Sequence, residues 1–197
     1  MSGRPAREGK FPEWKAFQVI ENPLSSTTEL VSAVKTLTVH MESAVLERLA
    51  TLLVARVRPE LLSEILSAAM LGNPVVLYLK MKVLQTAGQP QAADVAAEIV
   101  SRSSIEDPIA LLEAAQILMA GERYDLAAQA LRSALYLKPA YVFFSRSEKL
   151  IRDVWNVRPP LLRKLKIAVL GSSTTTFLIS VLRALCFRDG IDAEFYQ

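Results

Sequence analysis

A polar loop near the carboxyl end of the sequence has residue types suited to binding an anion or to nucleophilic chemistry. Gly171, Ser172, Ser173 and Thr174 open the sequence GSSTTT, which follows the apolar run KIAVL and precedes an apolar helical pattern. A loop that leads from a parallel strand into a helix presents free backbone N–H groups and the positive end of the helix dipole. The pattern therefore predicts a ligand site at Ser172, Ser173 and Thr174.

The same loop also has a purely structural interpretation. Serine and threonine are preferred at helix N-caps, so Thr174 or Thr175 could satisfy the first amide groups of the helix. Serine is activated by an adjacent base, and the single histidine, His40, is remote in the sequence. Because neither a GxGxxG motif nor a phosphate-loop lysine is present, we do not expect a nucleotide site. Capping and ligand binding remain the two alternatives.

Composition excludes several other kinds of site and partner. With one cysteine, Cys186, and one histidine, the chain cannot form an internal disulfide or a zinc site with several Cys or His ligands. We expect no metal site, and we expect Cys186 to be a buried small hydrophobe. The net charge of +3 is not concentrated on a dense basic face, so no nucleic-acid partner is expected. No apolar run of about 18 residues and no secretory signal occur, which predicts a cytoplasmic protein without a membrane partner.

The elements that would position the loop form a short strand–helix–strand unit. The run Lys166–Leu170 predicts a strand covered on both faces. Apolar spacing through residues 178–185 predicts a helix, which Asp189-Gly190 ends, and a second strand follows in 192–196. Such a βαβ unit is expected to be parallel. About thirty residues cannot hold their own core, so the unit either belongs to a longer domain or packs on the helical part.

The preceding sequence predicts a series of short helices. Apolar residues recur with helical period from residue 29 to 155, and the pattern is interrupted at Arg58-Pro59 and at Asn73-Pro74. Asn73-Pro74 recurs 34 residues later as Asp107-Pro108, which is the period of the tetratricopeptide repeat. The same offset relates further apolar residues, namely Leu77 to Leu111, Met81 to Ala115, Leu84 to Leu118, Ala93 to Ala127, Ala96 to Ala130 and Val100 to Ala134.

Residues 108–139 resemble a tetratricopeptide repeat, with one extra residue in the turn between Gly121 and Tyr124. Alanine at a helix contact lets two backbones approach closely, and larger side chains fill the remaining gaps. The residues predicted to pack the repeat are Leu111, Ala115, Tyr124, Ala127, Ala134 and Pro139. The predicted fold class is mainly α, a tetratricopeptide-like stack of α-hairpins followed by an incomplete α/β segment. The predicted domains are a lead-in at 1–26, the helical domain at 27–157, a linker at 158–165 and the start of an α/β domain at 166–197.

Residues 164–197 resemble the segment that opens the catalytic region of FkbH-like proteins of the haloacid dehalogenase (HAD) superfamily. The resemblance rests on the strand, the GSST loop, the helix and the motif GIDAEFY at Gly190–Tyr196. It implies a region like the SGNH hydrolase fold, then a HAD phosphatase-like domain that loads a glyceryl or related acyl unit onto a carrier protein. In that comparison Ser173 takes the nucleophile's place and Ser172 replaces an aspartate. Residues 1–197 contain no DxDxT motif, so the implied Mg²⁺ belongs to the HAD domain and no cofactor is expected in this sequence.

Three hypotheses follow for the function. In the first, the chain is the N-terminal protein-interaction region of an FkbH-like protein, which docks an acyl carrier protein or another pathway enzyme. In the second, it is a stand-alone tetratricopeptide-like adaptor without enzymatic activity. In the third, it is a small hydrolase or transferase that uses Ser173.

Overall fold

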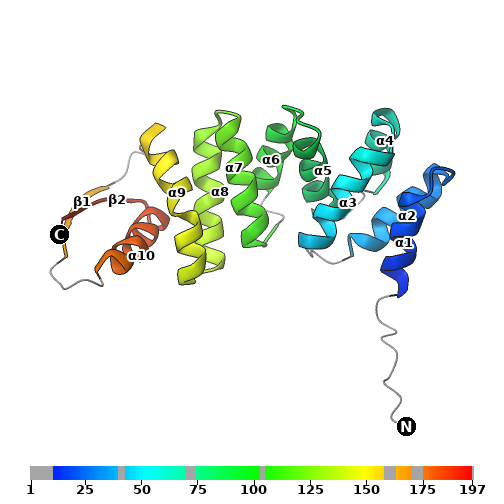
Figure 1. Ribbon diagram of the computed structural model, residues 1–197. Coiled ribbons are helices and arrows are strands. Elements are labelled where there is room, and N and C mark those ends of the chain that lie inside the picture. The colour runs from blue at the N-terminus through cyan, green and yellow to red at the C-terminus, as the bar shows by residue number, and fades with distance from the viewer. Residues whose placement is uncertain are drawn as a thin grey trace, which may run out of the picture. The chain divides into compact units, whose positions relative to one another are not determined.

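The computed structural model describes residues 11–39, 43–69, 74–102, 105–157, 163–169 and 175–196. Within these residues the chain forms ten helices and one parallel sheet of two strands (Figure 1). The prediction of a mainly helical chain followed by a βαβ segment is therefore confirmed. None of the helices in this described part is both long and apolar enough to cross a lipid bilayer.

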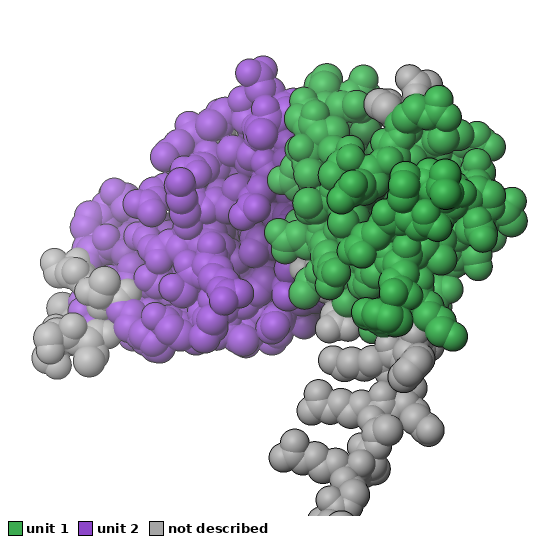
Figure 2. All heavy atoms as spheres, turned by 45° about the vertical axis from the view of Figure 1, so that its right-hand side comes forward, with its two compact units in different colours: residues 1–95 green, residues 96–197 purple. Residues whose placement is uncertain are grey.

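Two compact units make up the chain, residues 1–95 and residues 96–197 (Figure 2). The first contains α1 (Phe11–Glu21), α2 (Thr27–Leu37), α3 (Ser43–Arg56), α4 (Pro59–Ala69) and α5 (Pro74–Thr86). Helix α6 (Ala92–Arg102) begins in the first unit and ends in the second. The second unit continues with α7 (Pro108–Ala120), α8 (Tyr124–Leu137), α9 (Tyr141–Val157), β1 (Arg163–Ala168), α10 (Thr175–Arg188) and β2 (Ile191–Tyr196). The domain boundaries drawn from the sequence remain a prediction.

Helix α1 lies inside the segment that was expected to be a loose lead-in. Ala16 and Ile20 are buried at a spacing of four residues, and Phe17 packs partly against the same apolar core. Trp14 remains 59% exposed. The apolar residues of α1 are spread around the helix instead of gathered on one face, so the sequence has no clear helical period here.

Local sequence signals explain where the helices of the first unit begin. Ser26 caps α2 in a capping box: its hydroxyl accepts from the N–H of Glu29, and the Glu29 carboxylate accepts from the N–H of Ser26. Pro59 and Pro74 are the first residues of α4 and α5, where a missing N–H costs no helical hydrogen bond. In α3, Leu49 and Leu53 lie four residues apart on one face of the helix and are fully buried.

In the second unit, α7 and α8 form an antiparallel hairpin (Figure 1). The carboxylate of Asp107 accepts hydrogen bonds from the N–H groups of Ile109 and Ala110 at 2.9 and 2.8 Å, which fixes the start of α7. Gly121 ends α7 as predicted. In the turn that follows, Glu122 adopts a left-handed backbone with φ of 59°.

The strand prediction needs a correction at β1. The strand begins at Arg163, inside the predicted linker, and its side chains are exposed from Arg163 to Lys166 instead of covered on both faces. Lys164 and Lys166 alternate with Leu165 and Ile167, and alternate residues point to opposite faces of a sheet. In register, Lys164 lies opposite Asp192 and Lys166 opposite Glu194. The face that carries these charged residues therefore favours contact with water.

The βαβ unit packs on the helices of its own unit. Helix α10 packs against β2, α8 and α9. Its buried side chains are Ile179, Ala184 and Phe187, whereas Leu178 on the face expected from the sequence is 46% exposed. The helix is apolar on more than one side, so periodicity alone does not select the side that is buried. Of the two possibilities for the βαβ unit, packing on the helical part is the one found among the described residues.

We predict that Ala127→Leu destabilises the α7–α8 hairpin. Ala127 is fully buried, so three added carbon atoms have no free volume and must displace neighbours at a cost of about 1–3 kcal/mol. Urea unfolding measures this as a lower midpoint. Gln129→Leu, on the exposed side of α8, is the control and should leave the midpoint nearly unchanged. An unchanged midpoint for Ala127→Leu contradicts close packing at this position.

Candidate functional site

The loop predicted to bind a ligand, with Ser172, Ser173 and Thr174, lies outside the described residues, as does His40. The structure does describe what flanks this loop. Strand β1 ends at Ala168, α10 begins at Thr175, and β1 pairs with β2 in parallel. The ligand site and the candidate nucleophile Ser173 therefore remain predictions.

The residues predicted to pack the repeat divide into three groups. Leu111, Ala115, Ala127 and Ala134 are buried, with at most 5% of their surface exposed. Tyr124 is half-buried at the first position of α8, and Pro139 is exposed after the end of that helix. Four of the six side chains therefore belong to the core of the second unit.

One hollow of the second unit is a cavity of about 300 Å³, which we call the α9–β2 cavity. Its size is at the lower end of the range for small-molecule sites. Helix α9 contributes one wall, α10 contributes Arg183, and β2 contributes the remainder. The described residues that line it are Ile151, Arg152, Trp155, Asn156, Arg183, Ile191 and Ala193.

The electrostatic character of the α9–β2 cavity is positive. Nη1 of Arg183 donates to Oε1 of Glu148 at 3.1 Å, and its guanidinium carbon lies 5.7 Å from the centre of the Phe195 ring. Arg152 is exposed at the rim and no acidic side chain lines the cavity among the described residues. The sequence patterns did not predict this site. The one local feature that pointed to it was Arg183, a cation flanked by apolar residues in α10.

A second hollow, of about 140 Å³, lies between α7 and the start of α9, and we call it the α7–α9 groove. It combines exposed apolar side chains with cations: Ile109 is 36% and Val142 is 62% exposed. Exposed apolar clusters rimmed by polar groups are typical of protein-binding surfaces. The described residues that line the groove are Ile109, Leu112, Lys138, Ala140, Val142, Phe143 and Arg146.

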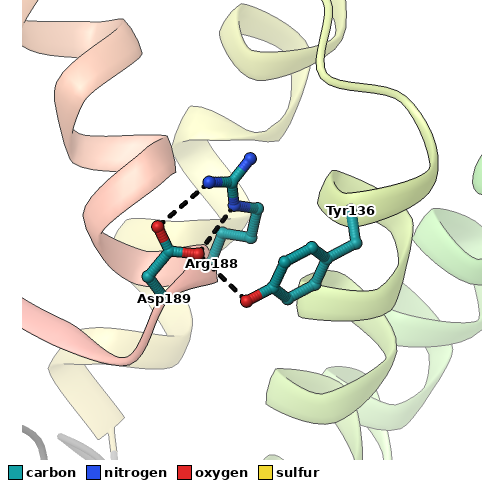
Figure 3. A network of polar contacts seen from close by, with 3 residues as sticks. All are labelled: Tyr136, Arg188 and Asp189. Carbon is teal, nitrogen blue, oxygen red and sulfur yellow. Dashed lines mark hydrogen bonds and ion pairs between the residues drawn. The ribbon is translucent and has the colours of Figure 1, made fainter.

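A polar network ties the end of α10 to α8 (Figure 3). Arg188 donates from Nε and Nη2 to the two carboxylate oxygens of Asp189 at 2.8 and 3.0 Å, and the Tyr136 hydroxyl donates to the same carboxylate at 3.0 Å. The guanidinium of Arg188 also lies 5.0 Å from the Tyr136 ring centre. The bonds from Arg188 hold the pKa of Asp189 below its ordinary value, and accepting from Tyr136 adds to this. The same bond to Asp189 raises the pKa of Tyr136.

Arg132 on α8 is a half-buried cation with incomplete hydrogen bonding. Its Nε and Nη2 are buried and have no hydrogen-bond partner. The guanidinium carbon lies 5.5 Å from the centre of the Phe187 ring, an attraction that offsets part of the desolvation cost. Because a buried N–H without a partner costs about 1–3 kcal/mol, Arg132 contributes little to stability for its size.

Neither a metal centre nor a reactive thiol stands out in the described part of the chain. No three His, Cys, Asp or Glu side chains among these residues are grouped so that they could hold a metal ion. Cys186 is half-buried, less than expected from the sequence, and burial raises the pKa of its thiol. At neutral pH this favours the unreactive thiol form.

Comparison with known proteins does not identify a relative. No protein-family model matches the sequence, and neither a curated protein nor a solved structure is significantly similar to it. Any function must therefore be argued from the cavity, the groove and the sequence patterns themselves.

We predict that Asp189→Asn reduces the acid sensitivity of the fold. A carboxyl group whose pKa is lower in the folded than in the unfolded chain stabilises the fold above its unfolded pKa, and this contribution is lost as the pH falls. When the pH is lowered from neutral to about 3, the melting temperature of the wild type should therefore fall further than that of the variant, and the difference should develop below about pH 4.

The control is Tyr136→Phe, which removes one of the three bonds to Asp189 and keeps the Arg188 pair. Its melting temperature should fall with decreasing pH by an amount between those of the wild type and Asp189→Asn. If the melting temperatures of all three proteins fall equally, this carboxylate does not stabilise the fold.

We also predict that Arg132→Met leaves the free energy of unfolding unchanged or raises it by about 1 kcal/mol. Methionine has a similar reach, keeps contact with the Phe187 ring and removes the buried N–H groups without partners. Urea unfolding is the measurement, with exposed Lys138→Met as the control. A loss of more than about 1 kcal/mol on Arg132→Met means instead that the guanidinium stabilises the fold.

Proposed function

We propose that the chain is a tetratricopeptide-like scaffold that binds another protein, as the N-terminal interaction region of an FkbH-like protein. The observation that carries the scaffold proposal is the burial of small side chains at matching positions of two helix pairs. Helices α5 and α7 begin 34 residues apart, at Pro74 and Pro108. Ala96 and Ala130, related by the same offset, are both fully buried. Repetition of buried positions at this period supports a repeat architecture.

Other pairs related by this offset behave in the same way, with one exception. Leu84 is only half-buried although its counterpart Leu118 is fully buried. In the remaining pairs both members are at most 8% exposed: Leu77 and Leu111, Met81 and Ala115, Ala93 and Ala127, and Val100 and Ala134.

The α7–α9 groove is the surface we propose for the partner. Val142 and Ile109 offer apolar contact, and Lys138 and Arg146 add positive charge beside them. This combination favours a protein segment with an apolar side chain between acidic ones. In the FkbH-like interpretation the partner is an acyl carrier protein or another pathway enzyme, and catalysis, with its Mg²⁺, belongs to the HAD domain.

The alternative function is a stand-alone adaptor with the same groove and no associated enzyme. Reading the coding DNA beyond the codon for Gln197 separates the two. An open frame that encodes a DxDxT motif supports the FkbH-like interpretation. A stop codon directly after Gln197 contradicts it and leaves the adaptor.

We predict that Arg146→Glu weakens binding of an acyl carrier protein from the same host by about tenfold or more, because it places a like charge against an acidic partner. Calorimetric titration of the full chain with the purified carrier protein measures this. Arg152→Glu is the matched control: an exposed arginine on the same helix that does not line the groove. Equal affinities of the wild type and Arg146→Glu, or no binding to either, contradict the proposed partner surface.

A further inference from the structure

We propose that the α9–β2 cavity binds a small aliphatic carboxylate, with the carboxylate held by Arg152 and Arg183 and the alkyl chain beside Trp155. This inference is independent of the protein-binding function proposed for the α7–α9 groove. It rests on the residues that line the cavity, which include apolar side chains and two arginines from different helices, Arg152 of α9 and Arg183 of α10.

The apolar walls determine the body of the ligand. Ile151 on α9 is fully buried, and Ile191 and Ala193 of β2 are half-buried. Trp155 is held in place by the Phe187 ring, with ring centres 5.5 Å apart and an angle of 50° between the rings. A volume of about 300 Å³ equals that of about ten water molecules in the liquid. A chain of about eight carbons with one polar head therefore matches the size of the site.

The charges determine the head group. Arg183 keeps donors available after pairing with Glu148, since one guanidinium carries five N–H groups and only Nη1 contacts this carboxylate. No ion pair of Arg152 with another described residue is present, and Asn156 adds an amide donor at the same wall. A planar carboxylate suits the fork geometry of arginine. An ammonium head group in the same place would instead meet two like charges.

Tryptophan fluorescence gives a direct test, because the sequence contains only Trp14 and Trp155. In the Trp14→Phe full-length chain, emission reports on the cavity alone. Octanoate, octanol and octylammonium share one alkyl chain and differ in the head group. We expect a saturable change in Trp155 emission with octanoate, about tenfold weaker affinity for octanol, and weaker affinity still for octylammonium.

Three variants in the same background locate the ligand. Arg152→Gln should weaken octanoate binding about tenfold and leave octanol binding within about twofold. Arg146→Gln is the matched control, an arginine of the same helix outside the cavity, and should change neither affinity. Ala193→Phe fills the cavity and should abolish binding of octanoate and octanol alike, with circular dichroism to verify that the variant is folded.

Several outcomes would overturn the proposal. These are no saturable response to octanoate at millimolar concentrations, equal affinities for octanoate and octylammonium, or octanoate binding that Arg152→Gln does not weaken. A misfolded Ala193→Phe leaves the head-group series and Arg152→Gln to decide. Arg152 is the test residue for the cavity and the control for the groove, and Arg146 has the opposite roles. If octanoate does not bind in the cavity, the protein-binding function proposed for the groove is therefore unaffected.

Discussion

The second unit depends on how closely the backbones of α7 and α8 approach each other. Alanines on both helices are fully buried, among them Ala114 and Ala115 on α7 and Ala127, Ala130 and Ala134 on α8. Close packing makes these alanine positions sensitive to added volume. The hairpin thereby becomes a rigid base on which α9 and then α10 are placed.

Helix α10 contacts α9 through aromatic side chains and α8 through polar ones. Phe187 is fully buried and tilts against Trp155, and the ring of Phe177 stacks on Tyr141 with centres 3.9 Å apart. The Tyr136–Arg188–Asp189 network adds hydrogen bonds at the end of the helix. These contacts place β2 beside α9, and the α9–β2 cavity exists because of that placement.

Two surfaces of different character result from this arrangement within one unit. The α7–α9 groove is rimmed by exposed apolar side chains, which suits a protein partner. The α9–β2 cavity is larger, has a buried floor at Ile151, and gathers arginines from α9 and α10.

The sequence by itself determined the local features. Ser26 and Asp107 mark helix starts through their side-chain oxygens, Gly121 marks a helix end, and the 34-residue offset identifies buried positions such as Ala127 and Ala130. All of these follow from interactions within one helix or one hairpin. The order strand, helix, strand in the tail was also readable, because it depends on the pattern of apolar residues along a short segment.

The tertiary structure alone decided which side of α10 is buried, and therefore that Arg183 lines the α9–β2 cavity. Apolar residues surround most of this helix, so its periodicity permits several buried faces; the contact of Phe187 with Trp155 selects one. The exposure of β1 and the inclusion of α1 in the core of the first unit are likewise decided by which elements pack against them. The α9–β2 cavity gathers residues more than forty positions apart in the sequence, such as Ile151 and Ala193. No local spacing encodes such a site, because it forms only when α9, α10 and β2 are packed together.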